Sequence, residues 1–168
     1  MIGPARDDEL DAICAVVEAA FGQPEEAALV RALVADGVVA VSLVARDGAG
    51  RIEGQVLYSH LIATSEEGER VAAVALAPVS VLPDRQGTGI GAALIAAGDA
   101  ACAELGATLS VVLGDPVYYT RFGYDVEAAR DLVCAYSGPH LMAKPLGECG
   151  AAGRPGRACL SRRVRLSR

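Results

Sequence analysis

The sequence lacks any stretch that would be expected to cross a membrane. No uninterrupted apolar run reaches the roughly 18 residues that a spanning helix requires, and residues 1–8 have no basic segment followed by an apolar one. Yet 52% of the 168 residues are hydrophobic, which is enough for a sizeable core. We therefore expect a folded cytoplasmic protein without a membrane partner.

Metal-ligating residues and disulfide patterns are also scarce. There are two histidines, and the five cysteines form an odd set without a C-x-x-C pair. These cysteines are Cys14, Cys102, Cys134, Cys149 and Cys159. The pattern supports neither a zinc site nor a disulfide framework. We expect no metal, and we expect Cys14 and Cys102, which fall within helical apolar patterns, to lie in the core.

Basic residues are few and unevenly placed. Lys144 is the only lysine among fifteen bases, a bias that by itself indicates no function. All 21 acidic residues precede residue 153, whereas residues 153–168 hold six arginines and no acid. An acidic globular part argues against nucleic acid as a partner and favours neutral or cationic substrates. We expect a single domain over residues 1–146, followed at 147–168 by a Gly- and Arg-rich segment that is either a last strand at 159–166 or a flexible tail.

Hydrophobic periodicity and turn residues predict a mixed order of helices and strands. The expected helices cover residues 8–20, 24–34, 90–105 and 117–122. The expected strands cover residues 1–4, 38–45, 52–62, 71–82 and 108–113, with weaker ones at 124–126, 131–136 and 141–143. The third helix joins the strands at 71–82 and 108–113, which is typical of a parallel crossover. Pro78 lies within the strand at 71–82, so that strand should be bulged there or lie at an edge.

Glycines alternate where the strand at 71–82 gives way to the next helix. The segment from Gln86 to Gly91 reads Q-G-T-G-I-G, which lets the backbone turn sharply and directs N–H groups outward at the positive end of the helix dipole. Such a loop is typical of a phosphate or pyrophosphate site. The absence of a nearby lysine disfavours a P-loop, and the glycine spacing differs from the G-x-G-x-x-G pattern of dinucleotide-binding folds.

Two blocks of residues together point to a known family. Gln86 to Gly91 match the signature Q/R-x-x-G-x-G/A, and Tyr119 to Tyr124 match Y-x-[KR]-x-G-[FY]. Over residues 1 to about 145, the chain resembles the GNAT superfamily of acetyl-CoA-dependent N-acetyltransferases. The segments 76–83 and 112–119 are similar in particular to the small bacterial YhbS-like branch of that superfamily.

The resemblance implies an α/β fold, with a mixed, mostly antiparallel central sheet flanked by helices and two splayed parallel strands at the cofactor cleft. Acetyl-CoA, a co-substrate, would lie with its pantetheine along the strand at 71–82 and its pyrophosphate in the glycine-rich loop, assisted by the Gln86 side chain and the Thr88 hydroxyl. A main-chain amide of Val79 or Ser80 would face the developing oxyanion. The implied cofactor-binding residues are Val79, Ser80, Val81, Gln86, Gly87, Thr88, Gly89, Ile90, Gly91 and Ala92.

The resemblance also implies a catalytic acid. Tyr119 occupies the family's tyrosine position, and an ordinary tyrosine pKa near 10 is close to that of a thiol, so Tyr119 is expected to protonate the departing thiolate. No general base is assigned, because the strand at 71–82 contains no acid. The remaining candidates, each better explained as a surface or structural residue, are Glu25, Glu26, His60 and His140.

The expected function follows from these assignments. It is the transfer of an acetyl group from acetyl-CoA to a primary amine of a small molecule or peptide, by direct attack in a ternary complex. One alternative is a non-catalytic acyl-CoA-binding sensor or regulatory module of the same fold. A nucleotide-binding protein is a weaker alternative because of the glycine spacing. The acceptor amine is not determined, and a homodimer is left open.

Overall fold

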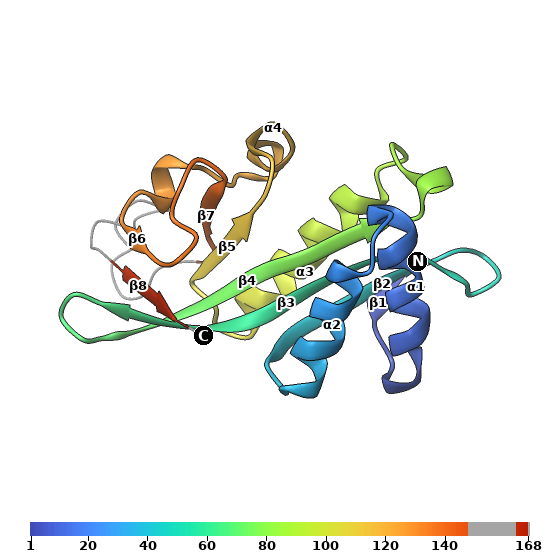
Figure 1. Cartoon of the computed structure of the whole chain (residues 1–168), viewed down its shortest axis with the longest axis horizontal. Helices are drawn as coiled ribbons and strands as arrows, with labels where there is room; N and C mark the ends of the chain where they lie inside the picture. Colours follow the sequence, from blue (N-terminus) through green and yellow to red (C-terminus); the bar gives the residue numbers. More distant parts are fainter. Residues whose placement is uncertain (148–163, 168) are drawn as a thin grey trace. The chain divides into compact units, whose positions relative to one another are not determined.

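The computed structural model describes residues 1–147 and 164–167. These residues form two compact units: unit 1 comprises Met1–Ser59 and Ala77–Gly98, and unit 2 comprises His60–Leu76 and the described part of Asp99–Arg168. Strands β3 (Ile52–Ser65) and β4 (Arg70–Val81) and helix α3 (Ile90–Glu104) contribute to both units (Figure 1). Each unit has a core cluster of its own.

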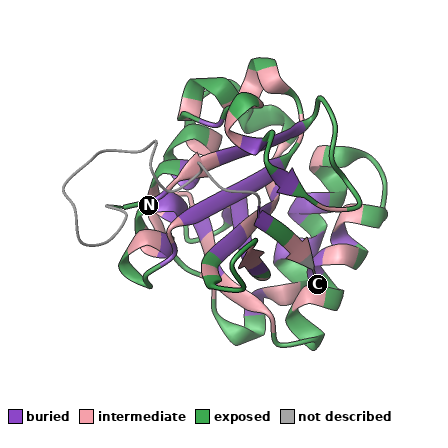
Figure 2. Cartoon of the chain, turned by 90° about the vertical axis from the view of Figure 1, so that its left-hand side faces the viewer, coloured by how far each residue is buried: buried purple, intermediate pink, exposed green. Residues whose placement is uncertain are grey.

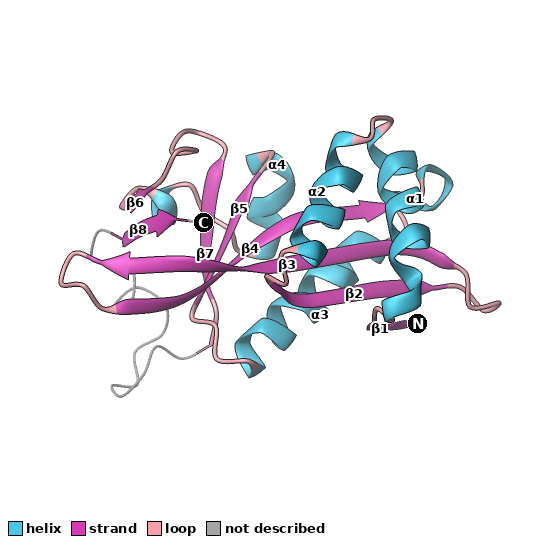
Figure 3. Cartoon of the chain, turned by 60° about the horizontal axis from the view of Figure 1, so that its bottom comes forward, coloured by secondary structure: helices cyan, strands magenta, loops and turns pink. Residues whose placement is uncertain are grey.

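Antiparallel strands and two helices make up most of unit 1. Strand β1 (Ile2–Pro4) pairs with β2 (Val39–Arg46), which in turn pairs with β3 as far as Ser59. Helices α1 (Leu10–Phe21) and α2 (Glu25–Ala35) separate β1 from β2 in the sequence, and a 3-10 turn at Asp7–Glu9 precedes α1 (Figure 3). Gly22 ends α1 with a φ of 71°, a left-handed conformation that glycine adopts without steric cost. The predicted break between the first two helices is therefore confirmed.

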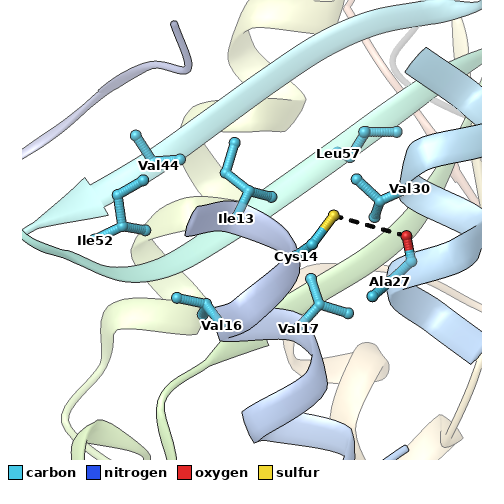
Figure 4. Close-up of a cluster of buried hydrophobic side chains, with 9 residues drawn as sticks. All are labelled: Ile13, Cys14, Val16, Val17, Ala27, Val30, Val44, Ile52 and Leu57. Atoms are coloured by element: carbon cyan, nitrogen blue, oxygen red, sulfur yellow. Dashed lines mark hydrogen bonds between the residues drawn. The ribbon is translucent and has the colours of Figure 1, made fainter. Parts of the chain in front are cut away.

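Apolar side chains of α1 and α2 pack on one face of β2 and β3 to form the core of unit 1 (Figure 4). Its buried members are Ile13, Cys14, Val16, Val17, Ala27, Val30, Val44, Ile52 and Leu57. The Cys14 thiol lies 3.7 Å from the carbonyl oxygen of Ala27, so it joins the two helices. Fully burying a valine, leucine or isoleucine side chain contributes about 1.5–3 kcal/mol relative to leaving it exposed. The expectation that Cys14 lies in the core is confirmed.

The first half of α3 packs closely on the strands of unit 1 because two glycines give it room. A Cβ atom on Gly54 of β3 would lie 3.0 Å from the Ile90 side chain and 3.1 Å from that of Leu94. A Cβ atom on Gly98 of α3 would collide with the ring of Tyr58, whose hydroxyl donates a hydrogen bond to the Ile95 carbonyl oxygen at 3.3 Å. The start of α3 is thus fixed against β3 with little freedom to shift.

Unit 2 is organised around strand β5 (Leu109–Leu113). β5 pairs in parallel with β4 and antiparallel with β7 (Leu141–Pro145). Strand β8 (Val164–Ser167) pairs antiparallel with the end of β3 and in parallel with β6 (Leu132–Val133). The remaining short elements are α4 (Pro116–Tyr119) and 3-10 turns at Thr120–Phe122 and Glu127–Ala129. The buried apolar cluster of unit 2 consists of Ala63, Ala73, Leu109, Val111, Ala129, Leu132, Leu141, Ala143 and Val164.

Among the described residues, six of the eight strands follow the order β1-β2-β3-β4-β5-β7; of the other two, β8 pairs with β3 and β6 pairs with β8. The buried positions are concentrated on the strands (Figure 2). This mixed, mostly antiparallel sheet with flanking helices is the fold class predicted from the sequence. The prediction of a weak strand at 124–126 was wrong in its extent, because only Asp125 pairs there, in an isolated bridge to Ala143. The predicted strand at 131–136 shortens to β6, and of the predicted last strand at 159–166, residues 159–163 lie outside the described residues.

Candidate active site

Strand β4 extends beyond its pairing with β5. The parallel register joins Ala73–Leu76 to Leu109–Val112, and β4 then continues to Val81. Pro78 therefore lies two residues past the last pair, where a missing N–H costs no hydrogen bond to β5. Although β4 is an interior strand in the sheet order, its last residues accommodate a proline for this reason.

The side chain of Gln55, on β3, is hydrogen-bonded to this end of β4. Its side chain is fully buried, and its Nε2 donates hydrogen bonds to the Ser80 hydroxyl at 3.0 Å and to the Pro78 carbonyl oxygen at 3.3 Å. Within the described residues, the Oε1 atom of Gln55 has no hydrogen-bond partner. Sequence reasoning missed Gln55. The signal was a single uncharged polar residue within the otherwise apolar segment 54–58.

The loop Gln86–Gly91, called the glycine loop below, follows a 3-10 turn at Pro83–Arg85. Gly87 and Gly89 have φ angles of 74° and 90°, which side chains rarely adopt, and a Cβ atom on either would meet nothing within 4 Å. Helix α3 starts at Ile90, so its first N–H groups have no carbonyl acceptor within the helix. The loop therefore offers backbone donors at the positive end of a 15-residue helix, with open space around Gly87 and Gly89.

Two polar side chains of the glycine loop stabilise the loop itself. The Gln86 side chain donates a hydrogen bond to the Val81 carbonyl oxygen at 3.1 Å, and the Thr88 hydroxyl donates one to the Arg85 carbonyl oxygen at 2.6 Å. At the base of the loop, Arg85 forms an ion pair with Glu53 at 3.0 Å. The side chains of Gln86 and Thr88 thus fix the backbone that precedes α3.

Tyr119 belongs to unit 2, whereas all ten predicted cofactor-binding residues belong to unit 1. It ends α4, which begins where the Asp115 carboxylate accepts a hydrogen bond from the Val117 amide at 2.9 Å. A Cβ atom on Gly114 would collide with the Tyr119 ring, so only glycine leaves room for that ring. Burial raises the pKa of the Tyr119 hydroxyl to about 12, with a smaller contribution from Tyr118. This pKa exceeds the ordinary value near 10 on which the sequence-based expectation was built.

A buried polar network lies next to Tyr119 in unit 2. It consists of Ser110, Tyr124, Asp99 and Lys144, and we call it the polar network. The Tyr124 hydroxyl lies 2.7 Å from the Ser110 hydroxyl and donates a hydrogen bond to Asp99 Oδ1 at 3.1 Å. Lys144 Nζ forms an ion pair with Asp99 Oδ2 at 2.7 Å. The tertiary structure therefore shows which residues the only lysine of the chain contacts, whereas the sequence indicated no role for it.

The four candidates for a general base are not buried in the structure. Glu25, His60 and His140 are exposed, and Glu26 is partly exposed. Both carboxylate oxygens of Glu26 accept hydrogen bonds from the Gln23 side chain at 3.1 Å. These positions agree with their interpretation as surface residues, and no base is assigned.

The described residues contain no group of three or more His, Cys, Asp or Glu side chains arranged to hold a metal ion. Burial raises the pKa of the Cys102 thiol to about 12, so this fully buried cysteine is a core residue, as predicted. In the part of the chain that the structure describes, no helix combines the length and the apolar character needed to span a membrane.

Comparison with known proteins identifies the family to which this arrangement belongs. The model of the acetyltransferase (GNAT) domain matches residues 1–126, and the chain belongs to this family of acetyltransferases. The matched region contains the end of β4, the glycine loop and Tyr119. Lys144 lies beyond it. The family and the enzyme class predicted from the sequence are confirmed.

Particular relatives lie in the branch that the sequence motifs indicated. The chain is 35% identical over 126 residues to YhbS, an uncharacterised N-acetyltransferase of Escherichia coli K12, with 75% of this chain and 74% of the relative aligned. The crystal structure of E. coli YhbS in complex with CoA matches with a TM-score of 0.79 and 31% identity, covering 88% of this chain and 81% of that one. A GNAT-family acetyltransferase from Brucella melitensis in complex with acetyl-CoA matches with a TM-score of 0.72 and 33% identity, covering 88% of each chain.

Proposed function

We propose that this acetyltransferase transfers the acetyl group of acetyl-CoA to a primary amine of a small molecule or a peptide. The amine attacks directly, in a ternary complex with both substrates. The observation that carries the proposal is the backbone of unit 1, where β4 continues past its parallel partner and leads into the glycine loop at the start of α3. Relatives at 31% and 33% identity were crystallised with CoA and with acetyl-CoA.

The residues of unit 1 fit a CoA thioester. The glycine loop presents the N–H groups of Gly87 to Ala92 to the pyrophosphate, and the open space around Gly87 and Gly89 gives its oxygens access. The pantetheine lies along Val79 and Val81, whose backbone is beyond the pairing with β5. The internal hydrogen bonds of Gln86 and Thr88 hold this loop in the shape that the ligand meets.

The acyl transfer begins at the end of β4. The lone pair of a neutral amine attacks the thioester carbonyl carbon, and negative charge develops on the carbonyl oxygen. Pro78 has no N–H to offer, so the oxyanion contact falls to the main-chain amide of Val79 or Ser80. Because Gln55 donates to both the Pro78 carbonyl and the Ser80 hydroxyl, it holds this segment in place. Preorganised donors of this kind stabilise the tetrahedral intermediate without moving.

Breaking the C–S bond then releases the CoA thiolate, and Tyr119 supplies its proton. A hydroxyl with a pKa of about 12 is protonated in essentially every molecule at neutral pH. It is also a weaker acid than a thiol. The proton therefore moves to sulfur as the C–S bond breaks and charge builds there. The attacking nitrogen loses its own proton to solvent, and solvent returns a proton to the Tyr119 oxygen, so that the enzyme regains its starting state. The products are the acetylated amine and CoA.

Composition supports the choice of acceptor class. The acidic residues 1–152 favour neutral or cationic amines over anionic ones. We propose that residues 1–146 act as one acetyltransferase domain in the cytoplasm, with neither nucleic acid nor membrane as a partner. Both a monomer and a homodimer are compatible with this proposal. A non-catalytic acyl-CoA sensor is not favoured, because the family is one of acetyltransferases.

The proposal is tested by measuring thiol release from acetyl-CoA with a panel of polyamines, aminoglycoside-like cations and peptides with free amines. We expect amine-dependent release with at least one cationic acceptor, together with an acetylated product seen by mass spectrometry. Isothermal titration calorimetry with CoA and acetyl-CoA is run in parallel. Binding without release for every amine would favour the sensor, and absence of binding would overturn the assignment of acetyl-CoA.

A further inference from the structure

The polar network of unit 2 places charged and polar side chains in a largely buried position, although the proposed mechanism uses none of them. Asp99, Ser110 and Tyr124 are each at most 6% exposed, and Lys144 is partly buried. Burying an ion pair costs desolvation, and apolar residues of similar volume often give the same stability or more. A network of this kind therefore needs a reason besides stability, and its position beside Tyr119 supplies one.

Two paired strands and a helix carry the network. Ser110 of β5 lies directly opposite Val74 of β4 on one side and Lys144 of β7 on the other. Directly paired residues on neighbouring strands point to the same face of a sheet, so the Ser110 and Lys144 side chains share one face. Asp99, on α3, meets Lys144 and the Tyr124 hydroxyl there. Three packed elements thus fix where the Tyr124 ring lies.

Lys144 lies against the backbone of Gly123 and next to the ring of Tyr124. Gly123 precedes Tyr124 with a φ of 86°, and a Cβ atom on Gly123 would lie 3.6 Å from Lys144 Cε. The Lys144 ammonium reaches Asp99 Oδ2 at 2.7 Å and lies 5.7 Å from the centroid of the Tyr124 ring. A planar guanidinium is larger and forks its donors. In a chain with fourteen arginines, this is the position that carries the only lysine.

The Tyr124 ring in turn confines the ring of Tyr119. The two ring centroids are 5.9 Å apart with the planes at 77°, an edge-to-face contact. The backbone of Gly114 lies against another part of the Tyr119 ring, and Tyr118 contacts it at a centroid distance of 5.0 Å. Contacts on several sides restrict the direction of the Tyr119 hydroxyl. That direction decides whether a proton reaches its target, since misplacement by about 1 Å costs up to about a hundredfold in rate.

We infer that Tyr124, anchored by Asp99, Lys144 and Ser110, is a positioning residue that orients the Tyr119 hydroxyl for proton transfer. The inference rests on the proposed function, in which Tyr119 is the acid. Tyr124 itself touches neither substrate in this mechanism. Its hydroxyl is committed to the polar network, and its ring acts through the contact with Tyr119.

The test is a double-mutant cycle between Tyr119→Phe and Tyr124→Phe. Tyr124→Phe keeps the ring and removes its anchor, so we expect kcat to fall about tenfold while KM for acetyl-CoA changes by less than about twofold. In the Tyr119→Phe background, Tyr124→Phe should cause no further loss of kcat. Tyr136→Phe, at a tyrosine that is 56% exposed, is the matched control and should keep the kcat of the parent chain.

The outcomes separate this inference from the proposed function. If Tyr119→Phe alone retains full kcat, the acid assignment fails and takes the positioning role with it. If Tyr119→Phe is impaired but Tyr124→Phe lowers kcat by the same factor in both backgrounds, Tyr124 is merely structural and the inference is overturned. Full kcat in Tyr124→Phe overturns it as well.

A second pair of variants covers the case in which Tyr124→Phe folds poorly. Lys144→Met removes the charge that pairs with Asp99, and Lys144→Arg restores it. We expect Lys144→Met to lower kcat several-fold and Lys144→Arg to recover part of the loss, again only when Tyr119 is present. Equal losses in the Tyr119→Phe background would overturn the inference by this route also.

Discussion

The glycine loop of unit 1 and the Tyr119 region of unit 2 differ in the groups that are proposed to act: backbone N–H groups in the first and a side-chain hydroxyl in the second. In the glycine loop, the groups proposed to bind are backbone N–H groups, and the Gln86 and Thr88 side chains are hydrogen-bonded within the loop. Around Tyr119, the group proposed to act is a side-chain hydroxyl, and rings and a buried polar network hold it. Backbone donors need space and a fixed main chain, whereas a side-chain donor needs neighbours. Changes in the two regions should therefore alter different kinetic constants.

The largest effect should come from removing the hydroxyl of Tyr119. We expect Tyr119→Phe to lower kcat by about 100-fold or more, since general acid catalysis contributes about 10²–10⁴-fold, while KM for acetyl-CoA stays within about threefold. Steady-state kinetics at saturating amine measure both constants. A kcat within about twofold of the parent chain would refute the assignment of Tyr119 and leave unit 2 without a catalytic group.

The next effect should appear in KM rather than kcat. Gly89→Val places a β-branched side chain at a φ of 90° in the open part of the glycine loop, so we expect KM for acetyl-CoA to rise about 30-fold. Gly50→Val is the matched control, because Gly50 has a φ of 85° and equally open surroundings in the turn between β2 and β3. Gly50→Val should lower the melting temperature without raising KM. An equal rise of KM in both variants would contradict ligand binding at the loop.

A side-chain support within unit 1 should give a smaller effect. Gln55→Leu removes the hydrogen bonds to Pro78 and Ser80. It also removes an Oε1 atom that has no partner among the described residues, so we expect a melting temperature within a few degrees of the parent. We expect kcat to fall about fivefold, because the backbone amides that face the oxyanion lose their support.

The control for this prediction is the double variant Gln55→Leu/Ser80→Ala. If Gln55 acts through the segment that contains Ser80, the double variant should be no slower than Gln55→Leu. Unchanged kcat in Gln55→Leu would show that the end of β4 keeps its conformation without this side chain. The proposed site in unit 1 would then depend on the backbone alone.

The smallest effect is expected in the pH profile. Tyr119 must be protonated to act, and its pKa of about 12 lies above the ordinary value, so its deprotonation reduces kcat only as pH rises through that higher value. We expect no fall of kcat between about pH 8 and pH 10, although an ordinary tyrosine would have lost its proton in half of the molecules at about pH 10. The profile is measured at saturating amine and compared with that of Tyr119→Phe. A decline with a midpoint near 10 that is absent in Tyr119→Phe would show that Tyr119 is not shielded from solvent.

Much of the fold and part of the candidate site were predictable, because their signals are local. Alternating glycines fix the loop before α3, and a proline-bearing apolar strand precedes it, so the strand, the loop and the start of α3 were predicted from the sequence. Gly22 and Gly123 mark helix ends by their left-handed conformation. The elements that sequence reasoning misjudged, at 124–126 and 131–136, are mostly apolar, but their short pairings depend on β7 and β8, which lie later in the chain.

The amino-acid sequence by itself determined the order of helices and strands, the glycine loop and the position of Tyr119. Each of these depends on backbone conformation and on residues close together in the chain. Only the tertiary structure decided that Gln55 supports the end of β4 and that Lys144 meets Asp99 and Tyr124 across three elements. It also decided that burial raises the pKa of Tyr119. Desolvation and long-range hydrogen bonds depend on which distant residues come into contact, and no local pattern encodes them.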